Sequence, residues 1–187
     1  MGYNISGLVI DKNYENNIEA LETILGEKLI FSTKVDFESG SENWKEDNYC
    51  DIYFSEKGTL IFTSIDRAIA QFKIKKQKAF SFALSEMTMT FAVNYTENGN
   101  IVRSFAETED EVRHQEVGEK LDFEKTESDP SELIYHLIEK TLGKKFWDID
   151  LDENCYRYHF ESQNISSEKD TTENNYNTSK KPWWKFW

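Results

Sequence analysis

The chain has 187 residues, which is enough for one domain with a sizeable core, and its 38% hydrophobic content is too high for a disordered chain. Its formal net charge of −13 argues against a nucleic-acid partner, because phosphate binding needs a basic surface. The charge fits either a cationic protein partner or a solvated acidic surface. No window approaches the roughly 18 apolar residues of a transmembrane segment.

The first part of the chain predicts a strand, a helix and a second strand. Residues 3–10 form the first strand. Apolar residues recur at helical spacing over 14–25, between Asn13 as a cap and Gly26 as a terminator. Residues 28–37 then alternate between apolar and polar side chains, which predicts a half-buried strand.

The middle of the chain predicts consecutive hairpins. Residues 49–55 and 59–64 pair across Lys57-Gly58. The longest alternating stretch, 79–105, loses its phase by one residue at Ser85-Glu86, which predicts a bulge or bend within a long strand. Asn98-Gly99 supplies the two residues of a tight hairpin turn.

The last part of the chain holds the clearest helix signal. Residues 107–129 are acidic and poor in apolar side chains, so we expect a surface excursion with one short strand near 120–124. Asp129 and the three residues after it match a capping box with proline at the first helical position, and Gly143 ends the helix. Residues 155–160 predict the final strand.

These elements indicate an α+β fold. We expect a largely antiparallel, twisted sheet of about seven or eight strands built from consecutive hairpins, with two main helices packed on one face. Residues 1–161 form this single domain. Residues 162–181 are polar and aperiodic, which predicts a flexible linker, and residues 182–187 form an aromatic and basic C-terminal docking tail.

No residue set carries a clear catalytic or metal-binding signature, so the sequence favours a protein that is not an enzyme and predicts no catalytic residue, cofactor or metal. Glu86 is the most interesting carboxylate: if the bulge beside it aims it into a pocket, its pKa would rise, but we favour the alternative that it marks a bend at a sheet edge. Cys50 and Cys155 are expected to be buried structural thiols. Asp148 begins a spacing typical of calcium loops, but Glu153 stands where that motif needs glycine.

Two groups of residues are candidates for partner binding. Three of the five tryptophans fall in the last five residues, and a few large aromatic side chains can supply most of the energy of a docking motif. The tail could dock on another protein, fold back on its own acidic domain, or lie at a membrane interface, which we rank last. The candidate residues are Trp183, Trp184, Lys185, Phe186 and Trp187 in the tail, and Glu107, Glu109, Asp110 and Glu111 in the acidic stretch.

As a small acidic protein of α+β pattern with aromatic-rich hairpins, the chain resembles the immunity proteins that accompany bacterial toxins. The resemblance implies a cytoplasmic, non-enzymatic inhibitor that neutralises its toxin by occlusion, steered by negative charge to a cationic partner. Two alternatives stay open. One is an adaptor or scaffold that works through its aromatic tail, and the other is a small hydrolase or transferase that uses Glu86 with a histidine.

Overall fold

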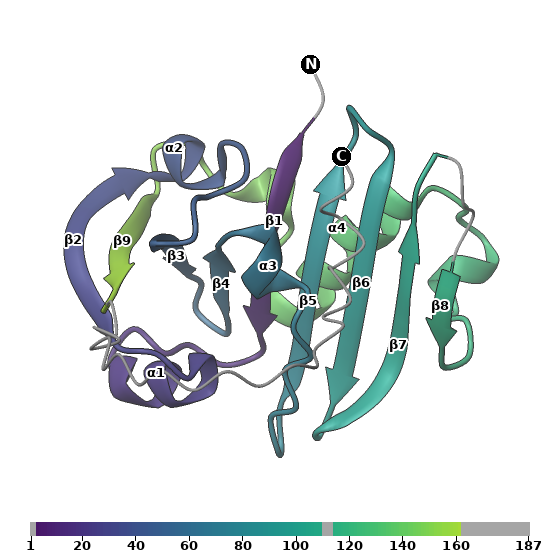
Figure 1. Ribbon diagram of the computed structural model, residues 1–187, viewed down its shortest axis with the longest axis horizontal. Helices are drawn as coiled ribbons and strands as arrows, with labels where there is room; N and C mark the ends of the chain where they lie inside the picture. The colour runs from purple at the N-terminus through teal and green to yellow at the C-terminus, as the bar shows by residue number, and fades with distance from the viewer. Residues whose placement is uncertain (1–2, 110–113, 162–187) are drawn as a thin grey trace, which may run out of the picture.

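A computed structural model describes residues 3–109 and 114–161 of the chain (Figure 1). Its strands are β1 (Asn4–Ile10), β2 (Leu29–Asp36), β3 (Tyr49–Phe54), β4 (Thr59–Phe62), β5 (Lys78–Ser85), β6 (Thr90–Glu97), β7 (Asn100–Glu107), β8 (His114–Val117) and β9 (Asn154–Phe160). Its helices are α1 (Ile18–Leu25), α2 (Phe37–Ser41), α3 (Ile65–Ala68) and α4 (Pro130–Leu142), with 3-10 turns η1 (Phe123–Lys125) and η2 (Phe146–Asp148).

The strands in this described part form one antiparallel sheet in the order β2-β9-β3-β4-β1-β5-β6-β7-β8. The predicted α+β class and antiparallel sheet are therefore confirmed. The described residues hold nine strands rather than seven or eight. The additional strand arises because the stretch expected to be one long bent strand is two strands, β5 and β6. The short strand expected near 120–124 lies instead at His114–Val117.

The phase slip at Ser85-Glu86 is a hairpin turn and not a bulge. Ser85 of β5 pairs with Thr90 of β6, and the chain reverses between them, with Met89 at a φ of 46°. A hairpin turn shifts the alternation of core-facing residues by one position, and so does the extra residue of a bulge. The sequence pattern alone therefore does not distinguish a hairpin turn from a bulge. The second turn is as predicted: Asn98 and Gly99 have φ values of 51° and 79°, as a type I′ hairpin requires.

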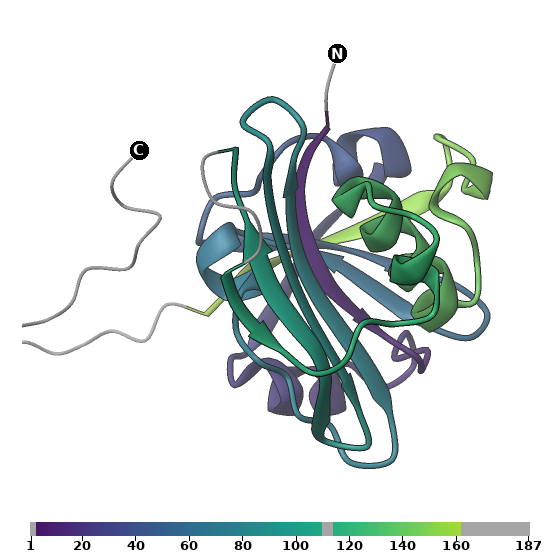
Figure 2. The same ribbon diagram turned by 90° about the vertical axis from the view of Figure 1, so that its right-hand side faces the viewer.

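The sheet buries side chains on both of its faces. Alternate residues of β1 enter different clusters, with Ile5 and Val9 packing with α4, and Leu8 and Ile10 packing with Leu21 of α1. The expectation of two main helices on one face is therefore not met, because α1 and α4 lie on opposite faces. Figure 2 shows α4 on one side of the sheet and α3 on the other. Periodicity identified each buried stripe but carried no information about which face it would cover.

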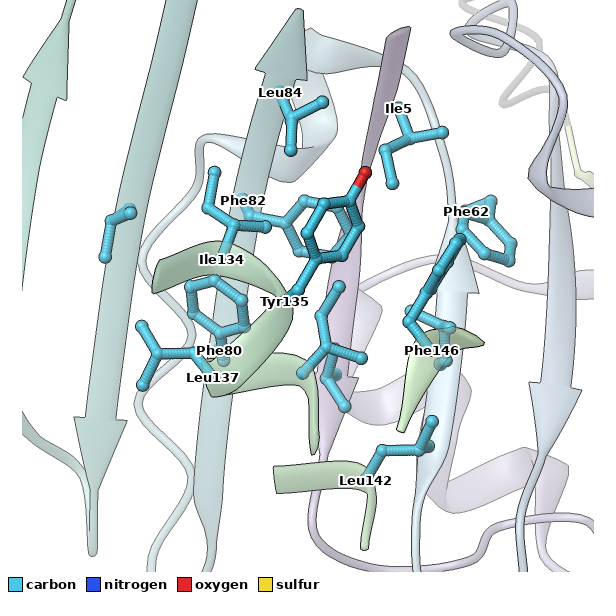
Figure 3. Close-up of a cluster of buried hydrophobic side chains, with 14 of the residues drawn as sticks. Ile5, Phe62, Phe80, Phe82, Leu84, Ile134, Tyr135, Leu137, Leu142 and Phe146 are labelled. Atoms are coloured by element: carbon cyan, nitrogen blue, oxygen red, sulfur yellow. The ribbon is translucent and has the colours of Figure 1, made fainter. Parts of the chain in front are cut away.

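Helix α4 covers the larger cluster, as its sequence predicted. Asp129 caps it by accepting a hydrogen bond from the Ser131 backbone N–H at 2.8 Å, and Gly143 ends it with a φ of 75°. Figure 3 shows how the buried side chains of α4 meet those of the central strands. The labelled residues are Ile134, Tyr135, Leu137 and Leu142 of the helix, Ile5 and Phe62 of β1 and β4, Phe80, Phe82 and Leu84 of β5, and Phe146.

Strand β1 occupies the middle of the sheet, between β4 and β5. Gly7 lets β1 and β4 lie close together at this point, because a Cβ atom at position 7 would lie 2.3 Å from the carbonyl oxygen of Ile61. The tight approach fixes β4, and with it α3 and the chain that follows, against the centre of the sheet.

Strand β2 forms one edge of the sheet and is less buried than its alternating sequence predicted. Its backbone pairs with β9, with a register shift between Phe31 and Thr33, and the side chains of Ile30 and Phe31 are 53% and 52% exposed.

None of the helices described here is long and apolar enough to cross a membrane.

Candidate protein-binding site

The structure gives Glu86 a role in the backbone framework. Its Oε2 accepts a hydrogen bond from the Tyr3 N–H at 3.0 Å, and its own N–H donates to the Tyr3 carbonyl at 3.0 Å. These two bonds attach the start of the chain to the β5–β6 turn. The Glu86 carboxylate thus holds the beginning of β1.

The histidines and cysteines occupy separate environments. His136 is half-buried and stacks on Phe123 with ring centroids 4.1 Å apart, although its helix position predicted a solvent-facing side chain. His159 is exposed beside Tyr49, and the side chain of His114 lies outside the described residues. Both thiols are buried and free, as predicted, and burial raises the pKa of Cys155 to about 12.

A buried ionic network joins β3, β9 and the segment after α2. Asp51 is fully buried and accepts two hydrogen bonds from Arg157, at 2.7 and 2.8 Å. Lys45 Nζ lies 3.2 Å from the same carboxylate and also donates to the carbonyls of Ser39 and Glu42. Burial lowers the pKa of Lys45, and the charge of Asp51 opposes this shift. Because its polar groups satisfy one another, the network anchors the segment that follows α2.

A second buried ion pair attaches the predicted surface excursion to the sheet. Arg103 is fully buried and donates to both carboxylate oxygens of Glu124, at 2.9 Å each, and it also pairs with Glu116. Glu124 in turn accepts a hydrogen bond from the Leu121 N–H at 2.9 Å. Glu124 therefore ties the segment around η1 to the sheet, while most residues of 116–129 are exposed, as expected of a surface excursion.

A polar cleft lies between the β3–β4 hairpin and the end of α4. The phenol of Tyr53 donates to Glu153 at 2.7 Å, while Lys144 donates to Tyr53 Oη at 3.2 Å and pairs with Glu153. Burial raises the pKa of Tyr53 to about 12, so the phenol stays protonated at neutral pH. The three groups neutralise one another, which leaves this cleft little net charge to offer a ligand.

Several basic residues fall between positions 67 and 78. Lys73, Lys75 and Lys76 are exposed, and Arg67 pairs with Glu27 rather than with the 107–129 segment. Within 3–109 and 114–161, no group of three or more His, Cys, Asp or Glu residues could hold a metal ion.

The partner-binding candidates are described only in part. Glu107 is half-buried at the end of β7, and Glu109 is exposed. Asp110, Glu111 and the tail residues Trp183, Trp184, Lys185, Phe186 and Trp187 lie outside the described residues.

Three adjoining depressions form a surface that no sequence motif announced. An apolar cavity of about 210 Å³ opens between α1 and α3; it is lined by Leu8, Leu25, Ile61, Thr63, Arg67, Ala70, Phe72 and Phe160. An acidic hollow of about 460 Å³ adjoins it and is lined by Gly26, Glu27, Asp47, Asn48, Arg67, Phe160 and Glu161. A third hollow of about 270 Å³ continues along α1 and is lined by Glu19, Glu22, Thr23, Gly26, Glu27, Lys28 and Glu161. We call the three together the composite site.

Arg67 and Phe160 stand where the apolar cavity meets the acidic hollow, since both line both depressions. The guanidinium carbon of Arg67 lies 3.8 Å from the centroid of the Phe160 ring. Its Nε donates to the Asp47 carbonyl at 3.0 Å, and Nη1 pairs with Glu27. The Arg67 side chain thus lies between the two depressions, and it is 28% exposed.

The rim of the composite site is negatively charged. Five carboxylates line it against two cationic side chains, Lys28 and Arg67, each of which is already paired with a glutamate. Hydrogen bonds from the Leu29 N–H and from Lys28 lower the pKa of Glu22. Glu19, Asp47 and Glu161 form no ion pair with the part of the chain that the structure describes. The site therefore offers free negative charge beside an apolar opening.

Thr63, one of the residues that line the apolar cavity, carries an unsatisfied polar atom. Thr63 is only 3% exposed, and its Oγ1 is buried without a hydrogen-bond partner among the described residues. A buried hydroxyl in that state costs free energy, which a ligand able to donate or accept a hydrogen bond would recover. The cavity therefore suits an aromatic group with a polar edge.

Sequence analysis missed this site because its residues come from distant segments. The acidic face of α1, the Arg67 helix and the end of β9 adjoin only because β9 pairs between β2 and β3. One signal was available: Glu19 and Glu22 lie on a short helix that ends at Gly26, and Glu15 precedes that helix. The sequence matched no known family model, and no curated protein or solved structure was found to be similar to it.

Proposed function

We propose that this protein is a non-enzymatic, acidic protein-binding module of the toxin-neutralising type, which covers a basic surface of its partner. The observation that carries the proposal is the composite site, in which hollows lined by carboxylates adjoin an apolar cavity. Charge on the rim would steer a cationic partner, and the cavity would receive an apolar or aromatic side chain from it.

The depth and chemistry of the cavity support a protein ligand. Small-molecule pockets commonly enclose about 300–1,000 Å³. The apolar cavity, at about 210 Å³, is smaller and suits one inserted side chain. The carboxylates are spread over the two adjoining hollows, which fits a cationic surface better than a single charged substrate.

Charge reversal tests the proposal. The full chain is co-expressed with basic effector proteins from neighbouring genes of its source, and complex formation and association rate are measured. Replacing Glu19→Lys and Glu161→Lys together should slow association at least tenfold at low salt, and rising salt should slow the unmodified chain.

A matched control variant has the same net charge as the Glu19→Lys, Glu161→Lys variant. Glu132→Lys with Asp152→Lys changes two exposed carboxylates outside the composite site and should leave association within about twofold, apart from a general charge effect. The proposal is wrong if both double variants slow association equally, or if no basic effector associates with the unmodified chain.

A further inference from the structure

The last described residues place the continuation of the chain at the composite site. The Phe160 N–H donates to the Asn48 carbonyl at 3.0 Å, and the Glu161 N–H donates to the Lys28 carbonyl at 3.0 Å. Phe160 lines the apolar cavity and the acidic hollow, and Glu161 lines both hollows. The described chain therefore ends, at Glu161, at the rim of the site.

The aromatic segment 182–187 has the chemistry that the apolar cavity lacks. It contains Trp183, Trp184 and Trp187, and each indole combines a large apolar ring with one N–H donor. A single ring is the appropriate size of group for a cavity of about 210 Å³. An indole N–H in this cavity could supply the hydrogen bond that Thr63 Oγ1 is missing.

The charges around the segment complement the rim. Lys180, Lys181 and Lys185 flank and interrupt the aromatic residues. The rim presents Glu19, Asp47 and Glu161 without an ion pair among the described residues. An aromatic residue in the cavity would place neighbouring lysines within range of these carboxylates, where opposite charges attract.

The connection is long enough for the contact to form within one chain. Residues 162–181 comprise twenty residues, which span at most about 70 Å when extended. Tethering makes binding intramolecular, with an effective concentration on the order of millimolar for a connection of this kind. Even a weak aromatic contact would then be occupied in a substantial fraction of molecules.

We infer that segment 182–187 is an internal ligand of the composite site, with one tryptophan in the apolar cavity and its lysines against the acidic rim. This inference rests on the proposed function, because the internal ligand would occupy the surface offered to the partner. The segment then acts as a competitor that a cationic partner must displace, and it shields the cavity until the partner arrives.

Fluorine NMR of the full chain labelled with 5-fluorotryptophan tests this inference directly. The five tryptophans give five resonances, which single Trp→Phe replacements assign. We expect one resonance among Trp183, Trp184 and Trp187 to be shifted from its position in the free peptide 180–187 and protected from a soluble paramagnetic probe. The shift should not change with protein concentration.

Neighbouring lysine substitutions provide the matched pair. Ala70 lines the cavity, whereas Gln71 is exposed beside it without lining the cavity. Ala70→Lys should return the shifted resonance to the free-peptide position, and Gln71→Lys should leave it in place. Thr63→Val removes only the unpartnered hydroxyl, so the fold should persist while the indole shift changes.

The inference is overturned if all three resonances coincide with those of the free peptide, or if Ala70→Lys has no more effect than Gln71→Lys. A shift that grows with protein concentration would instead identify a second copy as the occupant. Failure of the proposed function looks different: the indole would be docked, yet no basic effector would bind or displace it. Conversely, charge-dependent partner binding with an undocked indole would refute only the internal ligand.

Discussion

Arg103 and Arg67 have the same types of partner in two different settings. Each guanidinium lies over a phenylalanine ring, at 5.0 Å from Phe105 and 3.8 Å from Phe160, and each pairs with a glutamate. Arg103 and Glu124 are fully buried, whereas the Arg67 and Glu27 side chains are 28% and 32% exposed.

The difference separates a structural ion pair from the candidate binding site. Around Arg103, the donors and acceptors are used in holding η1 and β8 against β7. Around Arg67, a cavity and two acidic hollows remain open to a further molecule. The desolvation of a buried pair commits it to the fold, while an exposed pair contributes little stability and is free to rearrange.

The largest expected effect comes from breaking the buried pair. Arg103→Met should lower the free energy of unfolding by about 3–5 kcal/mol, because the buried Glu124 carboxylate loses the guanidinium that donates to both of its oxygens. Urea denaturation followed by circular dichroism measures it. Arg103→Met combined with Glu124→Leu should recover most of the loss, and a double variant as unstable as the single one would contradict this explanation.

The Asp51 network lies between these two extremes, because Lys45 is buried and Arg157 is partly exposed. Asp51→Asn should cost about 1.5–3 kcal/mol, since the charge-assisted bonds to both cations weaken while the side-chain shape is kept. The same denaturation measurement applies. A cost equal to that of Arg103→Met would show that exposure of one partner does not moderate the network.

Arg67→Met should change the free energy of unfolding by no more than about 1 kcal/mol, because its ion pair is screened by solvent. The same variant should nevertheless alter partner association, since Arg67 separates the apolar cavity from the acidic hollow. Denaturation and association measurements on one preparation of the variant show whether Arg67 affects stability, partner association or both. A large stability loss without any binding change would make Arg67 equivalent to Arg103.

The smallest expected effect concerns pH. The pKa of Glu22 is lowered in the folded protein, so its contribution to stability is present above the unfolded pKa of about 4.3 and disappears as pH falls through the folded value. Glu22→Gln should therefore be slightly less stable than the unmodified chain at pH 7 and equally stable near pH 3. Urea midpoints measured across this range test it; a difference that persists at pH 3 would point to another cause.

Local signals in the sequence predicted the parts of the fold that depend on a few adjacent residues. The caps of α4 and the Asn98-Gly99 turn are examples, because each is determined by backbone conformation within one turn. The Ser85-Glu86 slip was misinterpreted because a bulge and a reversal produce the same alternation. Arg103 and Glu124 were missed as partners because they are 21 residues apart and meet only through tertiary packing.

The candidate site was harder to predict than the fold. The aromatic segment and the acidic character were visible in the sequence, but the cavity exists only where β9 brings Phe160 beside α1 and α3. Local sequence patterns cannot predict that Phe160 lies beside α1 and α3, because this contact depends on the order of strands in the sheet. The alternation of β2 likewise gave no sign that the strand would lie at an edge.

The register shift in β2 has a consequence for self-association. An outermost strand presents unpaired backbone groups that can template a further strand from a neighbouring molecule, and exposed Ile30 and Phe31 would favour stacking there. The additional residue between Phe31 and Thr33, Ser32, bends strand β2 and interrupts its regular pairing with β9. Deleting Ser32 would straighten the strand, so the protein would become prone to growing fibres of itself.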